Sequence, residues 1–383
     1  MKKIKFLTLG ALATVTPVAM LISCQSTVQE TASQTTESKT SDFNSPESVI
    51  YNQRWLSNVW NTVSAEKTAM SQNLYNAAKK QFDAMITQSQ FDTKKVHIYD
   101  DKVVVDNPDE NKAIPVVFMD IDETVLNNYA FQNYLVLNNK TFDPVLWNQF
   151  VQDEKAIEIK GAFDFINYVW KNGGVVMFNS NREQENQKIA TLNNLVKEGL
   201  NKKFLPDWVW WMQGVDLSQN DPWNHIKKDN NGKRVKTDKE ERMNFLNERT
   251  QGFNLSSYNN SGNKVVFKTV MRVGDNYNDF NDTAVGSKLN PDRNKLLNDN
   301  LKLFGNFDTS VKGVKYIKTT DNQVKKENET WSESYILIGG NSSYGGFESA
   351  LASHYYTLDK AQQARALKEA LETLSWTPKQ TTN

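Results

Sequence analysis

IPVVFMDIDETVLNN, at residues 114–128, joins a short apolar run to a cluster of acidic side chains. Residues 116–119 are apolar but too few for a helix, which predicts a strand buried on both faces. Asp120 and Asp122 follow that strand directly, and Thr124 lies just beyond them. Two carboxylates at a buried strand end are costly unless a cation or a reaction requires them. Taken alone, the spacing D-x-D-x-T is equally compatible with turn chemistry or helix capping.

Short apolar runs alternate with helical patterns along much of the chain, and this alternation predicts an α/β fold. Strands are predicted at residues 116–119, 175–178, 208–212, 265–273 and 335–338, with an edge strand at 103–105. Helices are predicted within 49–86 with a break near Ser64, within 129–151, at 161–170, up to about 200, at 239–247 and at 358–374. The expected architecture is a parallel sheet with right-handed crossovers, flanked by helices.

Two of these helices carry apolar residues at helical spacing, which predicts that one face of each is buried. Leu56, Val59 and Val63 form such a set near the start of the folded part. Ile189, Leu192, Leu195 and Val196 form another on the helix that ends near residue 200.

The first 45 residues are predicted to target and tether the protein. Three lysines precede a largely apolar stretch at 6–22, and Leu-Ile-Ser-Cys then ends at Cys24, the only cysteine. This pattern resembles a bacterial lipobox, in which the cysteine is lipidated, and a transmembrane anchor is the alternative. Residues 25–45 are rich in Ser, Thr, Gln and Glu, which predicts a disordered tether. We therefore expect an extracytoplasmic protein that is lipid-anchored to the membrane and has no disulfide.

The composition excludes several function classes. The chain has 383 residues with 45 Lys plus Arg and 45 Asp plus Glu, so it lacks the basic field of a general nucleic-acid binder. Its three histidines, at 97, 225 and 354, are scattered, and there is no second cysteine, which disfavours zinc. The nucleotide-binding pattern G-x-x-x-x-G-K-[ST] is absent.

Three predicted strand ends carry polar side chains that suit one reaction. These are Asp120 with Asp122, Ser180 with Asn181, and Asp275 with Asp279, and Lys239 begins a helix between the last two. Parallel strands place their carboxyl ends at one edge of the sheet, so these groups are expected to meet there. Carboxylates from two strands suit a hard cation such as Mg²⁺.

The chemistry that fits this set is phosphoryl transfer. Asp120 is predicted to attack phosphorus, and Asp122 to act as general acid and base. Ser180 is expected to hold phosphoryl oxygens, and Lys239 to offset their charge. The metal is expected against Asp120, the Asp122 carbonyl and Asp275, with Asp279 orienting a water ligand.

The segments DIDET, FNSNR, TDKEER and GDNYNDF, in this order, resemble the four motifs of the haloacid dehalogenase (HAD) superfamily. More narrowly, they resemble the class C acid phosphatases, the bacterial lipoprotein nucleotidase group. The segment SAEKTAMSQNLYNAAK and the segment YGGFE near Tyr344 are similar to the N-terminal helix and the C-terminal segment of that family. The resemblance covers most of residues 49–351.

This resemblance implies an N-terminal helical region at 46–112, a HAD-like core at 113–350 with a small helical insert, and a C-terminal helix and tail at 351–383. It implies Mg²⁺-dependent hydrolysis of phosphomonoesters, often nucleoside monophosphates or aryl phosphates. Trp147 and Tyr344 match the aromatic residues that sandwich the substrate ring, and Asn181 and Arg182 are expected beside the substrate. Phe347 departs from the tryptophan of the family, and the polar insertions at 213–234 and 253–263 exceed its usual length.

Two other functions stay open from the sequence. A phosphatase for sugar or cofactor phosphates would use the same groups. A surface lipoprotein for adhesion or ligand capture would keep the fold without turnover, although the presence of every catalytic group argues against it. A homodimer is also possible.

Overall fold

The computed structural model describes residues 45–249, 251–299, 304, 310–318, 324–340 and 346–376. The predicted lipidation site Cys24 and the predicted ring-binding Tyr344 lie outside the described residues, as do the signal segment and nearly all of the tether. Within the described part of the chain, every helix is too short or too polar to cross a bilayer.

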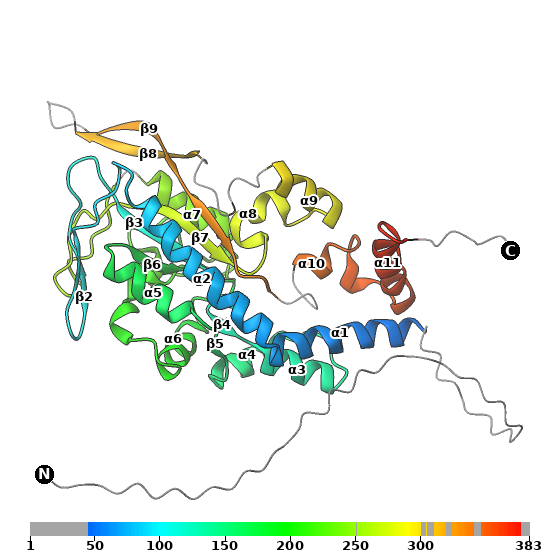
Figure 1. The fold of residues 1–383 in the computed structure, drawn as a ribbon. Coiled ribbons are helices and arrows are strands. Elements are labelled where there is room, and N and C mark those ends of the chain that lie inside the picture. Colours follow the sequence, from blue (N-terminus) through cyan, green and yellow to red (C-terminus); the bar gives the residue numbers. More distant parts are fainter. Residues whose placement is uncertain are drawn as a thin grey trace, which may run out of the picture. The chain divides into compact units, whose positions relative to one another are not determined.

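The described elements follow the predicted alternation of helices and strands (Figure 1). The helices are α1 Pro46–Val63, α2 Ala65–Met85, α3 Tyr129–Leu137, α4 Pro144–Gln152, α5 Ala162–Lys171, α6 Lys188–Lys197, α7 Lys239–Glu248, α8 Asn278–Val285, α9 Asn290–Asp299, α10 Gly346–Ser349 and α11 Lys360–Glu372, with 3₁₀ turns η1 Lys202–Phe204, η2 Asp207–Val209, η3 Pro222–Asn224 and η5 Tyr355–Thr357. The strands are β1 Val96–Ile98, β2 Val103–Val105, β3 Ile114–Met119, β4 Leu126–Asn127, β5 Ile157–Glu158, β6 Val175–Phe178, β7 Phe267–Gly274, β8 Ser310–Lys318, β9 Val324–Ser332 and β10 Ser334–Leu337.

The central sheet has the strand order β10-β7-β3-β6, and all of its pairings are parallel. Every residue of β3, β6 and β7 is buried, as the apolar sequences of β3 and β6 predict, and β7 also buries Lys268 and Arg272. Met119 lies opposite Phe178 on one side and opposite Val273 on the other. The three strands therefore end level with one another, so the residues that follow them emerge at one edge of the sheet.

Helix α2 is part of the core. Its residues Tyr75, Ala78, Phe82 and Met85 are buried in the same hydrophobic cluster as β3 and β6. Their spacing of three and four residues places them on one face of the helix. Burying each of the larger side chains contributes about 1.5–3 kcal/mol, so α2 is fixed firmly against the sheet. The helical break predicted near Ser64 is confirmed, because the side chain of Ser64 accepts a hydrogen bond from the Lys67 N–H and caps α2.

A small helical subdomain lies between β3 and α5 in the sequence. Strands β4 and β5 pair antiparallel and close it at its base. Helices α3 and α4 lie between them in the sequence. Asp143 caps α4 by accepting hydrogen bonds from the Val145 and Leu146 N–H groups.

The strand predicted at residues 208–212 is wrong. The segment begins in the 3₁₀ turn η2, and Trp210 makes only an isolated bridge to Phe178. Trp208, Trp210 and Trp211 are almost fully buried. Their rings pack in several directions, with Trp210 stacked on Phe178 and Trp208 on Phe267. The apolar run therefore reflects burial of rings in the core, not a strand of the sheet.

The antiparallel hairpin of β8 and β9 was not predicted. Its sequences, SVKGVKYIK and VKKENETWS, are rich in charged residues and lack an apolar run. Strands are recognised in a sequence by runs or alternations of apolar residues, so a largely polar hairpin is difficult to predict.

The two apolar helix faces predicted above are only partly buried. Leu56 on α1 is 76% exposed and Ile189 on α6 is 64% exposed. Helix α6 instead buries Ala190, Thr191, Asn194 and Leu195. The polar members of this set are hydrogen-bonded: Asn194 donates to the Ala156 carbonyl and accepts from the Ala156 N–H. Periodicity shows which side chains share a face, but not which face the fold covers.

Candidate active site

The sheet brings the predicted site residues to its carboxyl edge. Asp120 follows β3, and its N–H donates to the Val273 carbonyl of β7 at 2.9 Å. On the other side of β3, the Asn179 N–H donates to the Met119 carbonyl at 2.8 Å. These bonds extend the parallel ladders past the strand ends, so Asp120 is held between the segments that carry Ser180 and Asp275.

Three carboxylates gather at this edge. Asp120, Asp275 and Asp279 each offer one oxygen, and these oxygens lie within 4.8 Å of one another. Asp120 is 7% exposed. Burial raises the pKa of Asp120 to about 7, with Lys239 acting against the rise and Asp279 adding to it. Burial, together with Asp279 and Asp120, also raises the pKa of Asp275 well above its usual value.

Lys239 supplies a buried cation to these carboxylates. Its Nζ lies 2.6 Å from Asp120 Oδ1 and 2.8 Å from Asp279 Oδ1, and the residue is 3% exposed. Burial alone lowers the pKa of Lys239, but the pairs with Asp120 and Asp279 outweigh it and raise the pKa above its ordinary value. The two carboxylates therefore favour the charged form of the ammonium group, which lies directly beside Asp120.

The start of α7 is fixed by a residue that the sequence analysis missed. The Asp282 carboxylate of α8 accepts hydrogen bonds from the N–H groups of Lys239, at 2.6 Å, and Glu240, at 3.0 Å. These donors have no partner within the helix, so an acidic side chain there stabilises the helix start. Asp282 thereby sets where the Lys239 side chain begins. It lies three residues after Asp279 in the sequence, which is the only local sign of its role.

Asp279 organises the turn that carries Asp275. Its Oδ2 accepts hydrogen bonds from the N–H groups of Asp275, at 3.0 Å, and Asn276, at 2.9 Å. A Cβ at Gly274 would lie 2.5 Å from the Asp279 carboxylate, so only glycine fits there. Asp279 does not cap α8, which removes the simplest structural alternative for this residue.

Asp122 is held by one of its two oxygens. Oδ1 accepts from Asn128 Nδ2 at 2.8 Å, from Arg182 Nε at 2.9 Å and from Arg182 Nη2 at 2.8 Å. Oδ2 makes no hydrogen bond to the described residues. The side chain is 24% exposed. Asn128 and Arg182 thus orient the carboxylate through one oxygen and leave the other available for proton transfer.

The Arg182 guanidinium group is hydrogen-bonded to several protein side chains. Besides Asp122, it donates through Nη1 to Thr191 Oγ1 at 2.9 Å and through Nη2 to Asn128 Oδ1 at 3.1 Å. The residue is buried. The structure therefore places Arg182 as the residue that orients Asp122.

The segment after β6 contributes one buried and one exposed side chain of the predicted set. Ser180 is fully buried, and its Oγ accepts from the Arg182 N–H at 3.1 Å. Asn181 is exposed. Asn179, which the sequence analysis did not select, donates to the Lys239 carbonyl at 3.1 Å and accepts from Arg242 Nε at 2.6 Å. It joins β6 to α7 and so fixes Lys239 relative to Ser180.

Trp147 on α4 lies beside this network. The Arg182 guanidinium carbon is 5.5 Å from the centre of its ring. On its other sides, the ring packs against Phe131 at 5.3 Å and Phe150 at 5.7 Å. Trp147 is only partly buried. The helical subdomain thus presents an aromatic ring next to the residues that hold Asp122.

The donor set fits a hard divalent cation. Among the described residues, the cluster consists of carboxylates without histidine or cysteine, and carboxylate oxygens are the ligands that Mg²⁺ prefers. Burial raises the pKa values of Asp120 and Asp275, and Lys239 acts against the rise in both. A bound cation would favour their ionised forms.

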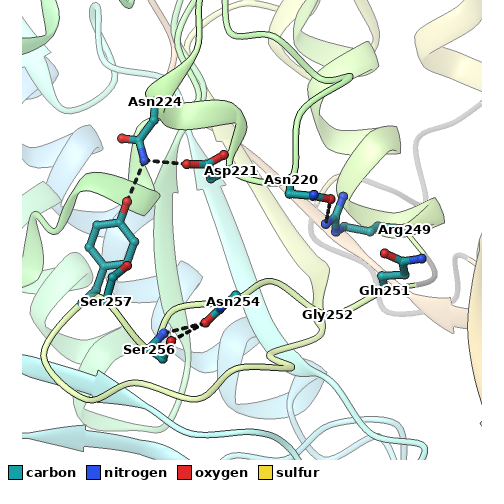
Figure 2. Close-up of a pocket in the computed structure, with 10 residues that line it drawn as sticks. Asn220, Asp221, Asn224, Arg249, Gln251, Gly252, Asn254, Ser256 and Ser257 are labelled. Atoms are coloured by element: carbon teal, nitrogen blue, oxygen red, sulfur yellow. Dashed lines mark hydrogen bonds between the residues drawn. The ribbon is translucent and has the colours of Figure 1, made fainter.

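A pocket of about 490 Å³ lies apart from this cluster and shares no residue with it (Figure 2). Its lining is polar and comes from the end of α7 and from the two insertions noted in the sequence, with Asn224, Arg249 and Asn254 among its residues. Part of it belongs to the loop that leads into β7, whereas Asp120 and Asp275 follow strand ends.

Comparisons with known proteins agree with this geometry. A family model described as HAD superfamily, subfamily IIIB (acid phosphatase) matches residues 31–303, well over half of the chain. The class C acid phosphatase from Bacillus anthracis has a similar fold, with a TM-score of 0.55 and 21% identity over 85% of this chain and 100% of that one. A structure of the Bacillus anthracis enzyme with tungstate bound matches with the same TM-score and coverage at 20% identity. The chain belongs to the subfamily IIIB acid phosphatases of the HAD superfamily and is a phosphoric monoester hydrolase.

Proposed function

We propose that this protein hydrolyses phosphomonoesters in two steps through an aspartyl-phosphate on Asp120, with Mg²⁺ as its metal. The observation that carries the proposal is the cluster of Asp120, Asp275 and Asp279 around the Lys239 ammonium group at one sheet edge. Apolar residues would stabilise the fold better than this cluster, because buried charges are destabilising unless they are compensated. The cluster is therefore better explained by a function than by stability.

Asp120, Asp275 and the Asp122 carbonyl would hold the metal, with Asp279 behind them. When bound, Mg²⁺ would screen the charge of the phosphoryl group so that a carboxylate can approach it. Lys239 occupies Asp120 Oδ1 through its 2.6 Å contact. This contact orients the Asp120 carboxylate and adds positive charge where phosphoryl oxygens would lie.

In the first step, an oxygen of Asp120 forms a bond to phosphorus while the bond from phosphorus to the leaving oxygen breaks. Asp122 donates a proton to that leaving oxygen through Oδ2, the oxygen that Arg182 and Asn128 do not hold. The alcohol product then leaves, and the phosphoryl group stays on Asp120.

In the second step, Asp122 takes a proton from water. That water attacks phosphorus, the bond from phosphorus to Asp120 breaks, and inorganic phosphate and the free carboxylate result. Asp122 serves both steps because the first leaves it deprotonated and ready to act as a base. Ser180, fixed next to Arg182, supports the oxygens of the phosphoryl group in both steps.

The favoured substrates are nucleoside 5'-monophosphates and aryl phosphates. The partly exposed ring of Trp147 beside Arg182 supports this choice, because stacking on an aromatic ring accepts many planar leaving groups. Sugar or cofactor phosphates are the alternative substrate class. The protein is further proposed to act outside the cytoplasmic membrane through a lipid on Cys24, which rests on the lipobox-like sequence.

Phosphate release by the protein lacking residues 1–24 tests this proposal. We expect release from a purine monophosphate and an aryl phosphate at rates well above those with a sugar phosphate. EDTA should abolish release, and added Mg²⁺ should restore it. A non-catalytic surface lipoprotein would release no phosphate from any of the three, and equal rates in EDTA would contradict the metal assignment.

A further inference from the structure

The inner face of α2 reaches the carboxylate cluster. Lys67, Ser71 and Tyr75 are spaced by four residues and are all buried, so they share the face that meets the core. The first contact is a hydrogen bond of 2.6 Å from the Tyr75 hydroxyl to the Thr124 carbonyl. Thr124 belongs to the segment that carries Asp120 and Asp122. Helix α2 also lies along β7 and β10, the two strands nearest Asp275 (Figure 1).

Lys67 makes the second contact of this face. It is 8% exposed, which is rare for a lysine without a specific role. Its ammonium group donates to the Gly339 carbonyl, in the turn that follows β10. Burial lowers the pKa of Lys67, and the charges of the nearby Asp275 and Glu123 carboxylates act against this lowering.

The turn that Lys67 holds lies directly on Asp275. The Ile338 N–H donates to the Gly274 carbonyl at 2.8 Å, and the Gly340 N–H donates to the Asp275 carbonyl at 3.2 Å. A Cβ at Gly340 would lie 2.1 Å from Asp275 Oδ2. Nothing larger than glycine fits between this backbone and the carboxylate. The position of the turn therefore limits where the Asp275 carboxylate can point.

The charges around the cluster are consistent with this arrangement. Asp120, Asp275 and Asp279 share one site, and Glu123 is buried close enough to Lys67 to act on its charge. Lys239 contacts Asp120 and Asp279, and Lys67 is close enough to Asp275 and Glu123 for their charges to act on it.

We propose that Lys67 is a positioning residue for the metal site: it holds the Gly339–Gly340 turn against Asp275 and so fixes that ligand. Helix α2 thereby becomes part of the active site without touching the substrate. This inference rests on the proposed role of Asp275 as a metal ligand. It also gives a role to the first turn of α2, which lies beside the site although it is far from the motifs in the sequence.

The test measures metal binding directly, by electron paramagnetic resonance of free Mn²⁺ in titrations of the full-length protein in detergent. Lys67→Met removes the donor and keeps the length of the side chain, and we expect Mn²⁺ to bind about tenfold more weakly, the usual effect of losing a partner of a ligand. Lys67→Arg retains a charged donor and should stay within about threefold of the wild type. Lys80→Met, at an exposed position of the same helix, should bind Mn²⁺ as the wild type does.

Hydrogen exchange of the peptide that contains residues 334–340 gives a second readout. Lys67→Met should speed exchange in this peptide, and Lys80→Met should not. Gly340→Ala approaches the same contact from the other side, because its Cβ would meet Asp275 Oδ2. It should also weaken Mn²⁺ binding, and it keeps the test valid if Lys67→Met does not fold.

The outcomes separate this inference from the proposed function. If Lys67→Met binds Mn²⁺ as tightly as the wild type, or more tightly, Lys67 is only a neighbouring positive charge that repels the metal, and the inference is overturned. Asp275→Asn should abolish Mn²⁺ binding whatever Lys67 does. If Asp275→Asn binds Mn²⁺ normally, the metal site of the proposed function is itself wrong.

Discussion

Replacing Lys239 by methionine removes an ammonium group that contacts two carboxylates of the cluster. Its Nζ lies 2.6 Å from Asp120 and 2.8 Å from Asp279, and all three residues are buried. Removing one partner of a buried ion pair typically costs about 3–5 kcal/mol, because the other charge is left uncompensated. We expect a loss of this size in the free energy of unfolding near pH 8, without metal.

The loss in the free energy of unfolding should depend on pH, because carboxylates that have lost their positively charged partner can bind protons. Burial already raises the pKa of Asp120 to about 7 while Lys239 acts to lower it, so the variant should have a still higher value. A carboxyl whose folded pKa lies above its unfolded one holds more protons in the folded state, so stability falls as pH rises through that range. At pH 5 the carboxyl is protonated in the folded variant, and we expect less than half of the loss seen at pH 8.

Urea unfolding in EDTA at pH 5 and pH 8 measures both values. Lys236→Met is the matched control, because Lys236 is exposed and lies three residues earlier. It should change the free energy of unfolding by no more than about 0.5 kcal/mol at either pH. A loss for Lys239→Met that is equal at the two pH values, or below about 1 kcal/mol at pH 8, would refute this reasoning.

The other predictions concern proton transfer, the metal and the substrate ring. Arg182→Lys should lower kcat about 100-fold for a poor leaving group but much less for dinitrophenyl phosphate, since Arg182 orients the general acid Asp122; equal losses for both substrates would argue against that role. In the metal-free wild type, the raised pKa of Asp120 makes a contribution to the free energy of unfolding that is fully present below about pH 4 and is lost as the pH rises to about 7. Because Mg²⁺ favours the ionised carboxyl, it should raise the Tm more at pH 8 than at pH 5. A Mg²⁺ effect that does not vary with pH would contradict this. Trp147→Ala should raise KM for an aryl phosphate more than for a sugar phosphate, whereas an equal rise would assign Trp147 to packing with Phe131 and Phe150 alone.

The sequence predicts the parts of the site that lie next to a strand. Apolar runs locate β3, β6 and β7, and the polar residues after them are therefore placed at one edge. The parallel order of the sheet then brings Asp120 and Asp275 together, although they are far apart in the chain. Lys239 was predictable because a capping pattern marks the start of its helix.

The residues that hold the site residues in position cannot be predicted from the sequence in the same way. Asp282, Asn179 and Lys67 act through hydrogen bonds to backbone groups far away in the sequence. No periodicity or spacing records such a contact, because it arises only when separate elements pack. The same limit explains the wrong strand at residues 208–212, where three tryptophans are buried by ring packing and not by sheet pairing.

The proposed mechanism requires that the Asp120 carboxylate becomes phosphorylated during turnover. Rapid acid quench of the protein during turnover, followed by mass spectrometry of its peptides, tests this directly. We predict an added phosphoryl group on the peptide that contains Asp120, lost in Asp120→Asn together with turnover, while Asp122→Asn keeps the group attached for longer. Phosphate release by Asp120→Asn at a rate close to that of the wild type, or a phosphoryl group on another residue, would contradict the account.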